Sequence, residues 1–371
     1  MSLTKLFGKE EVNVSRQFEF DFAKAVCILG MVFVHCFEEL TPDSAAGTGA
    51  LYYIIVTVLD AVFGAGTFML CMGLGIAYSW KENANKLIRR GCVIFVLAYV
   101  LNAVRDGLPR LLLIPSGVRT VESLTDGFLC VDIMMFAGLA LLLFGLLKKA
   151  KVSDLWLLII SLAMSAVGSF VRFIDCGSTL WNELAGLFIG TYSETDPDVY
   201  ACFPLLNWFC VVVIGYLYAK ALRRCRDLHR YYTIAFPVSA LFLAVYLAVT
   251  IPGGIGLMNS DILYYYQFTT PEVAVLFFGM VFATGLYHFI SLPFSDRPKR
   301  IITRISSNIN RIYCIHWILV CWISYVFEVF YYDGMQDGMT VVTAIVIFAV
   351  SVLLAEFYTR CRENKRLKKN P

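Results

Sequence analysis

Several ionisable residues lie within one apolar stretch near the N-terminus of this chain. Asp21 and Lys24 stand at its beginning, His35 lies near its end, and Glu39 closes it. His35 lies eleven positions after Lys24, and at about 100° per residue this step returns to within about 20° of the same helix face. Glu39, four residues after His35, is spaced to hold the imidazole or to stabilise its protonated form. Because ionisable groups inside a bilayer are costly and usually functional, this stretch marks His35 as a candidate for proton-transfer chemistry.

Other polar residues in apolar stretches are predicted to lie at different depths in the membrane. Asp132 and Asn207 fall near outer helix ends, at a depth close to that of His35. His316 lies near the start of its stretch, which predicts a position in the inner half. Ordinary alternatives exist for two of these residues: Lys24 can snorkel to the interface, and His35 can be a packing residue.

Composition identifies the elements that must position these residues. The 371 residues are 59% hydrophobic and 16% charged, whereas soluble domains are about half apolar and a quarter charged. A helix needs about 20 mostly apolar residues to cross a bilayer. We therefore predict an all-α, polytopic membrane bundle of about ten helices, near residues 18–40, 52–79, 90–105, 126–147, 153–173, 202–221, 232–251, 271–292, 308–330 and 339–359. A short interfacial or re-entrant helix is expected at 180–191.

Charge supports this count and gives an orientation. If both termini are cytoplasmic, the basic residues of the tails and of the even-numbered connections share one side, as the positive-inside rule requires. Of the 31 Lys and Arg residues, four fall on the other side and Arg311 lies within a helix. The four exceptions are Arg105, Arg110, Arg119 and Arg172. The net charge of +3 is too small and too spread to predict nucleic-acid binding.

The twelve cysteines and four histidines are scattered, so no metal site is expected. Most of the cysteines fall inside apolar stretches. Cys176 and Cys202 flank one outer connection and are the only pair suspected of forming a disulfide.

A family resemblance begins at residues 20–35, which read F-D-F-A-K-A-V-C-I-L-G-M-V-F-V-H. This run resembles the opening signature of the transmembrane acyltransferase superfamily, namely an aspartate, a basic residue three later, ten residues and a histidine. The superfamily includes the acyltransferase-3 proteins and the heparan-α-glucosaminide N-acetyltransferase-like proteins, and the choice between these branches stays open. Lys24 stands where arginine is commoner, and lysine lacks the bidentate fork of a guanidinium. Later segments also resemble family motifs: residues 66–78, 131–139, 203–208 and 312–317.

The resemblance implies a single transmembrane acyltransferase-like domain over 1–371. It would move an acyl group, in the first place acetyl from cytosolic acetyl-CoA, to a hydroxyl or amine of a carbohydrate-type or cell-envelope acceptor, as in O-acetylation. Its setting would be the lipid bilayer of a bacterial plasma (inner) membrane, with a homodimer left open. The donor phosphates would meet basic groups of the inner side: Lys24, Lys86, Arg89, Arg90, Arg223 and Arg224.

Acyl transfer needs a base or a nucleophile and donors for the oxyanion. Under the resemblance, His35 is the base, with an acyl-histidine intermediate as a variant. Glu39 or Asp132 would orient it, and Asn207 would contact the oxyanion or the acceptor. The rival functions are a proton-coupled transporter or flippase, which would move a solute without forming product, and a membrane sensor that has lost the chemistry.

Overall fold

The structure is a computed structural model that describes residues 6–42, 50–52, 54–56, 64–78, 83–117, 122–196, 199–259, 261–330 and 332–367. Within these ranges the chain is predominantly helical, and its strand-like pairing consists of three isolated bridges. Seven helices are long and apolar enough to cross a membrane. They are α1 (Phe18–Leu40), α5 (Ala84–Asn102) with its continuation to Leu113, α11 (Leu205–Arg223), α12 (Leu228–Gly253), α14 (Glu272–Ser291), α16 (Ile309–Val329) and α17 (Asp337–Leu367).

Three shorter helices complete the order that the sequence predicts. These are α4 (Ala65–Ala77), α8 (Ile133–Lys149) and α9 (Asp154–Phe170). The chain is therefore a multi-pass, all-helical membrane protein, and about ten helices is confirmed as its plan. The predicted helix 52–79 is described only in part, because residues 53, 57–63 and 79 lie outside the described ranges.

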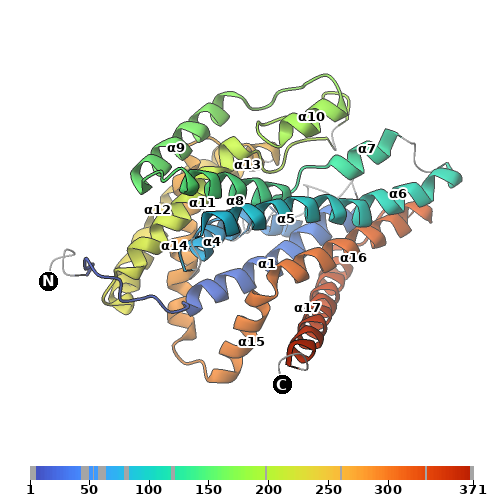
Figure 1. Cartoon of the computed structure of the whole chain (residues 1–371). Helices are drawn as coiled ribbons and strands as arrows, with labels where there is room; N and C mark the ends of the chain where they lie inside the picture. The colour runs from blue at the N-terminus through green and yellow to red at the C-terminus, as the bar shows by residue number, and fades with distance from the viewer. Residues whose placement is uncertain are drawn as a thin grey trace.

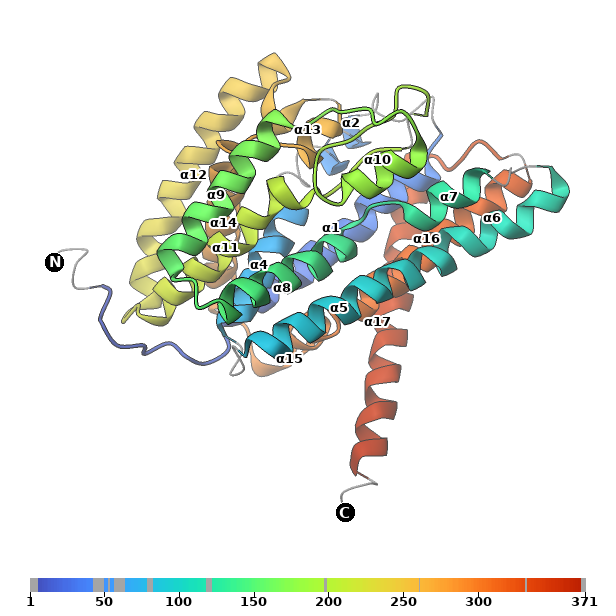
Figure 2. The ribbon, with the colours of Figure 1, turned by 45° about the horizontal axis from the view of Figure 1, so that its top comes forward.

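Helix α1 lies at the centre of the bundle and carries His35. It packs against α4, α14, α16, α17 and the short polar helix α15 (Asp296–Ser307), as Figure 1 shows. In Figure 2 the C-terminal half of α17 leaves the bundle and points away from the other helices. Residues far apart in the sequence can therefore meet along α1.

Glycines let α4 and α11 approach each other closely. A Cβ added at Gly73 would lie 2.0 Å from the Val212 carbonyl oxygen, and one added at Gly215 would lie 2.2 Å from the Leu70 carbonyl oxygen. Small residues at such crossings are typical of helices that pack inside membranes. The glycine-rich second helix of the sequence is thus a close-packed helix over its described part.

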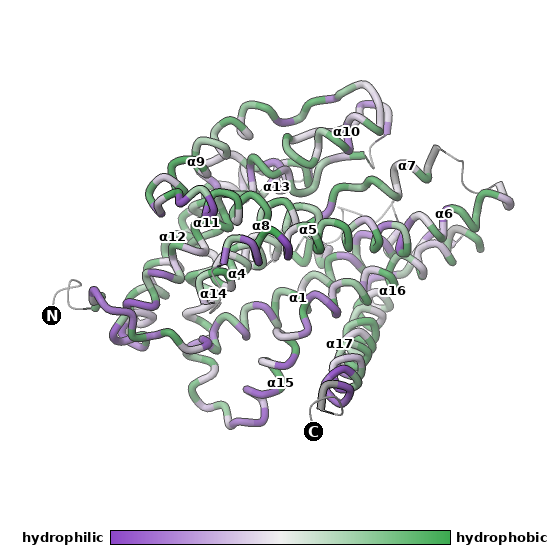
Figure 3. Tube along the Cα trace, viewed as in Figure 1, coloured by the Kyte–Doolittle hydropathy of each residue, from purple (hydrophilic) through white to green (hydrophobic). Residues whose placement is uncertain are grey.

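The outer surface is apolar along the helices and polar at their ends. Leu241 on α12 and Leu353 on α17 are each 68% exposed, which suits contact with lipid. Figure 3 shows hydrophilic residues gathered at the N-terminal segment, on α15 and at the end of α17. We call this the basic end of the bundle; it also includes the connection between α11 and α12.

Two predicted helices differ in their ends from the observed ones. The predicted helix 126–147 is two helices, α7 (Glu122–Leu129) and α8, separated by extended backbone at Asp132. Asp132 caps α8 by accepting a hydrogen bond from the Ile133 N–H, a role that aspartate favours at helix starts. The predicted helix 90–105 begins earlier, at Ala84, and continues through a π-helical turn, η3 (Ala103–Gly107), into α6 (Leu108–Leu113).

Short helices cap the end of the bundle opposite the basic end. The expected interfacial helix at 180–191 is present as α10 (Thr179–Gly186). The connection before α14 contains η5 (Gly256–Met258) and α13 (Leu263–Tyr266). These segments close over the end of α1 that bears His35.

Candidate functional site

His35 is held by a carboxylate one residue earlier than predicted. Its Nδ1 lies 3.0 Å from Oε2 of Glu38, on the same helix, and both side chains are mostly buried. The prediction gave this role to Glu39 or Asp132, and both residues line the same cavity. Glu38 is three residues after His35 and Glu39 four, and both spacings share one helix face.

Helix α16 brings a second histidine against the first. The rings of His35 and His316 are stacked with centroids 5.6 Å apart, and the Trp317 ring lies 3.9 Å from that of His35. The sequence predicted different depths for these residues, His35 in the outer half and His316 in the inner half, whereas the structure places the two rings at the same level. Position along a helix does not give depth when two helices start at different levels.

A buried ionic network lies beside the histidines, and the sequence did not reveal it. Arg105 donates to Asp132 at 2.7 Å and to Asp106 at 2.9 Å, and Tyr313 donates to the same oxygen of Asp132 at 2.7 Å. Arg105 is 3% exposed and lies over the Trp317 ring at 4.4 Å. Trp317 therefore touches both the histidine pair and the ionic network.

The π-helical turn explains how Arg105 reaches this position. Such a turn inserts a residue into the helix and shifts the face that later side chains present, and it is frequent at functional sites. Here it contains the pair Arg105–Asp106, at the end of an apolar run that the sequence suggested was a loop boundary. The available signal was an arginine directly following a long apolar stretch.

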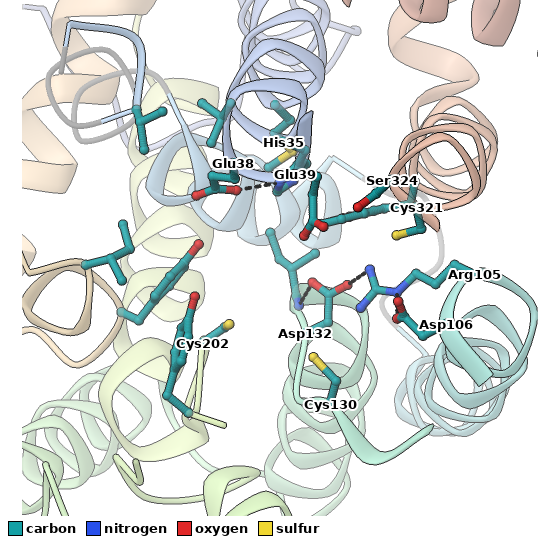
Figure 4. Close-up of a pocket in the computed structure, with 18 of the residues that line it drawn as sticks. His35, Glu38, Glu39, Arg105, Asp106, Cys130, Asp132, Cys202, Cys321 and Ser324 are labelled. Atoms are coloured by element: carbon teal, nitrogen blue, oxygen red, sulfur yellow. Dashed lines mark hydrogen bonds and ion pairs between the residues drawn. The ribbon is translucent and has the colours of Figure 1, made fainter. Parts of the chain in front are cut away.

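These groups surround a cavity of about 860 Å³ at the end of the bundle opposite the basic end. Figure 4 shows His35, Glu38 and Glu39 on one wall and the Arg105–Asp132 pair on another. Carboxylates outnumber guanidinium groups in the lining, which includes Glu38, Glu39, Asp106, Asp132 and Asp333 against Arg105 and Arg110. Tyrosines form much of the remaining wall: Tyr52, Tyr200, Tyr265, Tyr266, Tyr313, Tyr325 and Tyr332.

Two ring nitrogens beside His35 are buried and lack a hydrogen-bond partner among the described residues. They are Nε2 of His316 and Nε1 of Trp317. The other nitrogen of His316, Nδ1, lies 3.1 Å from the Ile312 carbonyl oxygen. A buried polar group left unpaired costs about 1–3 kcal/mol. Of these two residues, Trp317 lines the cavity, whereas His316 is absent from its described lining.

The connection 171–204 holds the walls of the cavity. Glu183 accepts a hydrogen bond from the Val131 N–H at 3.0 Å and so fixes the backbone that precedes Asp132. Gln267 donates to the Thr191 carbonyl at 2.8 Å and joins this connection to α13. Both side chains are buried, so the segment is a packed wall.

A carboxylate on the surface of the same connection fixes its shape. The backbone N–H groups of Glu194 and Gly177 donate to Asp175, as does the Asn182 amide, and these bonds lower the pKa of Asp175. A lowered pKa in the folded state adds stability above the ordinary aspartate range. That stability is lost as the pH falls through the lowered value.

The structure does not bring Asn207 to the cavity. Its amide donates to the Phe268 carbonyl at 2.8 Å, and the residue is fully buried between α9 and the connection before α14. Asn207 supports the tyrosine wall from behind and is absent from the described lining. The described lining therefore gives no support to the predicted contact of Asn207 with an oxyanion or acceptor.

The six basic residues predicted to hold the donor also lie outside the described lining of the cavity. Lys86, Arg89 and Arg90 are exposed at the start of α5, and Lys24 is half-buried on α1. Arg224 is exposed at the end of α11.

Arg223 is engaged in holding the N-terminal segment. It donates to the Ala77 carbonyl at 2.7 Å and pairs with Glu11 at 2.7 Å. The backbone of residues 6–13 runs along residues 222–226 and makes several hydrogen bonds with them. The Arg223 side chain therefore helps to hold the N-terminal segment against the ends of α4 and α11.

The suspected disulfide is not formed, since Cys176 and Cys202 are both free thiols. Cys202 instead lines the cavity, as does Cys130. Among the described residues, no group of three or more His, Cys, Asp or Glu side chains is placed to hold a metal ion.

Comparison with known families gives one match. The family described as heparan-alpha-glucosaminide N-acetyltransferase, catalytic, matches residues 16–249, from the start of α1 to near the end of α12. The matched region contains His35, Arg105 and Asp132, whereas His316 and Trp317 lie beyond it. No curated protein and no solved structure shows significant similarity to the chain.

Proposed function

The chain belongs to the heparan-alpha-glucosaminide N-acetyltransferase catalytic family, and from this membership we propose that it moves acetyl from acetyl-CoA to a hydroxyl or amine of a carbohydrate-type acceptor. The transfer takes place in the cavity beside His35. Other acyl-CoA donors are compatible with the same chemistry. The observation that carries the proposal is the His35–Glu38 pair on the wall of that cavity.

The Glu38 contact determines which nitrogen of His35 can act as the base. A carboxylate accepts hydrogen bonds, so Nδ1 of His35 carries the proton in this pair. Nε2 then keeps its lone pair and can accept a proton from the acceptor. Glu38 also stabilises the imidazolium that forms, as an orienting carboxylate does in other acyl-transfer sites.

The reaction follows from this arrangement. His35 Nε2 removes the proton from the acceptor oxygen or nitrogen as that atom attacks the thioester carbonyl carbon. The carbonyl oxygen becomes an oxyanion, and the carbon–sulfur bond then breaks. The departing CoA thiolate takes the proton from the His35 imidazolium, which returns the base to its starting state.

We assign stabilisation of the oxyanion to the side of the cavity formed by α16. The Trp317 indole N–H is a donor only, is buried, and has no partner among the described residues. Preorganised donors of this kind contribute strongly when they face developing negative charge in a site that excludes water.

The cavity lining supports a sugar-like acceptor. Tyrosine side chains offer flat apolar faces and hydroxyl groups together, a combination that suits the faces and hydroxyls of a carbohydrate. The surplus of carboxylates over guanidinium groups favours a neutral or amine-bearing acceptor over an anionic one. We place this mouth outside a bacterial plasma membrane, with both termini in the cytoplasm, on the basis of the distribution of basic residues.

For the donor phosphates we propose the exposed cluster Lys86, Arg89 and Arg90. From Lys86 to Arg105 the helix rises by about 28 Å, close to the full hydrocarbon thickness, so the pantetheine arm must span much of the bundle. Binding of CoA should weaken with salt and in the double variant Arg89→Gln, Arg90→Gln. Unchanged binding in that variant would move the nucleotide to the cavity end.

The proposed reaction is tested with purified protein in vesicles and labelled acetyl-CoA. Appearance of label in a sugar or glycolipid extract supports the transferase, and free CoA should form in equal amount. Flux of a solute without acylated product would instead indicate the transporter. Comparing cell-envelope glycans with and without the protein would identify the acceptor.

A further inference from the structure

A second cavity, of about 800 Å³, lies at the basic end and takes no part in the proposed reaction. It is formed by α15, the start of α16 and the end of α17. Its described lining is polar throughout and consists of Asp296, Lys299, Arg300, Thr303, Arg304, Ser307, Asn308, Arg311, Thr359 and Glu363.

The charges of this cavity are only partly neutralised. Arg304 pairs with Glu356 at 2.7 Å and with Glu363 at 3.1 Å, so its charge holds α15 to α17. By contrast, Lys299, Arg300 and Arg311 form no ion pair with a carboxylate of the described chain.

Neutral groups hold Arg311 in place. It donates to Asn308 at 2.6 Å and to Thr359 at 3.1 Å, both in the lining. Three cations therefore line the cavity without a described ion pair, and the four basic residues of its described lining outnumber its two carboxylates, Asp296 and Glu363.

Hydrogen-bond donors suited to phosphate oxygens accompany these cations. The hydroxyls of Thr303, Ser307 and Thr359 and the amide of Asn308 all line the cavity. Charge-assisted bonds from Lys and Arg, combined with hydroxyl donors, are the usual means of holding a phosphate.

The surfaces beside the cavity are apolar and open. On α17, Glu356, Thr359 and Glu363 share the face turned to α15 and α16. At about 100° per residue, Leu353 and Phe357 lie on the adjoining flank, and each is 68% exposed. A ligand with a phosphate in the cavity would thus have an apolar surface beside it, on a helix that faces lipid.

We propose that this cavity holds the phosphate headgroup of an anionic membrane phospholipid, with acyl chains along the exposed flank of α17. Basic pockets between membrane helices, at the side rich in Lys and Arg, bind such headgroups. The phosphates of CoA share the same chemistry but have no acyl chain at that end to cover Leu353 and Phe357. The lipid would tie α15 to α17 where α17 leaves the bundle (Figure 2).

The test uses the full-length protein in a neutral detergent, titrated with phosphatidylglycerol or with phosphatidylcholine of the same acyl chains. Thermal unfolding reports stabilisation, and native mass spectrometry counts bound lipid. We expect phosphatidylglycerol to bind and raise the Tm, and phosphatidylcholine to do neither at the same concentration. In the variant Lys299→Gln, Arg300→Gln the affinity for phosphatidylglycerol should fall roughly ten- to thirtyfold.

The matched control is Arg362→Gln, Lys365→Gln, which removes the same charge from the end of α17 but outside the described lining. This control should bind phosphatidylglycerol as the wild type does. Equal losses in both variants would mean that diffuse charge attracts the lipid, and the proposal would fall.

Soluble competitors separate the two sources of phosphate. Displacement of the lipid by CoA or by inorganic phosphate would assign the cavity to a soluble ligand and overturn the proposal. Should the double variant unfold in detergent, Arg300→Gln alone serves, because Arg300 is exposed and forms no described hydrogen bond. Unchanged affinity in that folded variant counts against the site.

Discussion

The four histidines of the chain form two pairs at opposite ends of the bundle, and the two pairs use their ring nitrogens differently. At the basic end, His288 places one nitrogen 2.7 Å from Glu19 and the other 3.1 Å from His229. At the cavity end, His35 contacts Glu38 through Nδ1 and stacks on His316, whose Nε2 is buried without a described partner. Both pairs thus combine two imidazoles with one glutamate.

The difference in how the ring nitrogens are engaged suggests a structural role for the first pair and a catalytic role for the second. A general base needs a free lone pair within reach of substrate. Both nitrogens of His288 are already occupied by protein groups, and they join the starts of α1 and α12 to the end of α14. His35 has one nitrogen occupied and lies on the wall of a cavity large enough for a substrate. Residue type is the same in the two pairs, and the second pair is the one that we propose for catalysis.

The largest effect should follow from removing the base of the cavity pair. His35→Gln keeps polarity but has no useful basicity, so turnover should fall by about 10² to 10⁴. Product formation from labelled acetyl-CoA is the measurement, with CoA binding and the Tm as checks on folding. Near-full turnover in a folded His35→Gln protein would remove His35 from the mechanism.

The second effect concerns stability and compares the ionic networks of the two ends. Arg105→Gln leaves Asp132 and Asp106 buried beside each other, and breaking a buried pair in this way costs about 3–5 kcal/mol. Arg304→Gln breaks a half-exposed pair at the basic end and should cost about 1 kcal/mol or less. Thermal unfolding of both variants in one detergent measures the contrast. Equal losses of stability would show that the cavity network is not distinctive.

Much of the fold could be predicted from the sequence because long apolar runs identify membrane helices. The order of the helices and the short helix α10 followed from composition and from the length of the apolar stretches. The ends of the helices were harder to predict than their order. The sequence placed Asp132 within one helix, whereas the structure places it between two helices, where its side chain caps the second.

The site was only half predictable, for two physical reasons. A period of 3.6 residues cannot reveal a π-helical turn, so Arg105 was taken for a surface charge at the outer side. Depth was the second difficulty, since His35 is 17 residues into α1 and His316 only seven into α16. The two rings meet because the first turns of α1 pack on α15, where Ser306 donates to Asp21 at 2.7 Å. The helix α15 precedes α16 in the chain and lies beside the start of α1. As a result, α16 begins at a level farther along α1.

A third, smaller effect distinguishes the two glutamates that follow His35. Glu38→Gln removes a hydrogen bond to the imidazolium, and bonds to charged groups contribute about 1.5–3 kcal/mol, or roughly ten- to a hundredfold in rate. Glu39→Gln should change turnover by less, because the described partner of His35 is Glu38. The ratio of the two rates is the measurement. A larger loss for Glu39→Gln would restore the assignment made from the sequence.

The smallest effect is expected at the other histidine pair, and it tests the comparison itself. His288→Gln keeps a polar side chain between Glu19 and His229 but weakens both contacts. Loss of ordinary hydrogen bonds costs about 0.5–1.5 kcal/mol each, so the Tm should fall slightly. Turnover should stay close to that of the wild type, because the basic end lies outside the described walls of the cavity.

The decisive measurement is turnover at a temperature well below the unfolding transitions of the wild type and of His288→Gln, where both proteins are fully folded. If His288→Gln protein is folded there and fails to form product, a base is required at the basic end. The chemistry would then have to move away from His35, and the acceptor would enter from the side on which the basic residues lie.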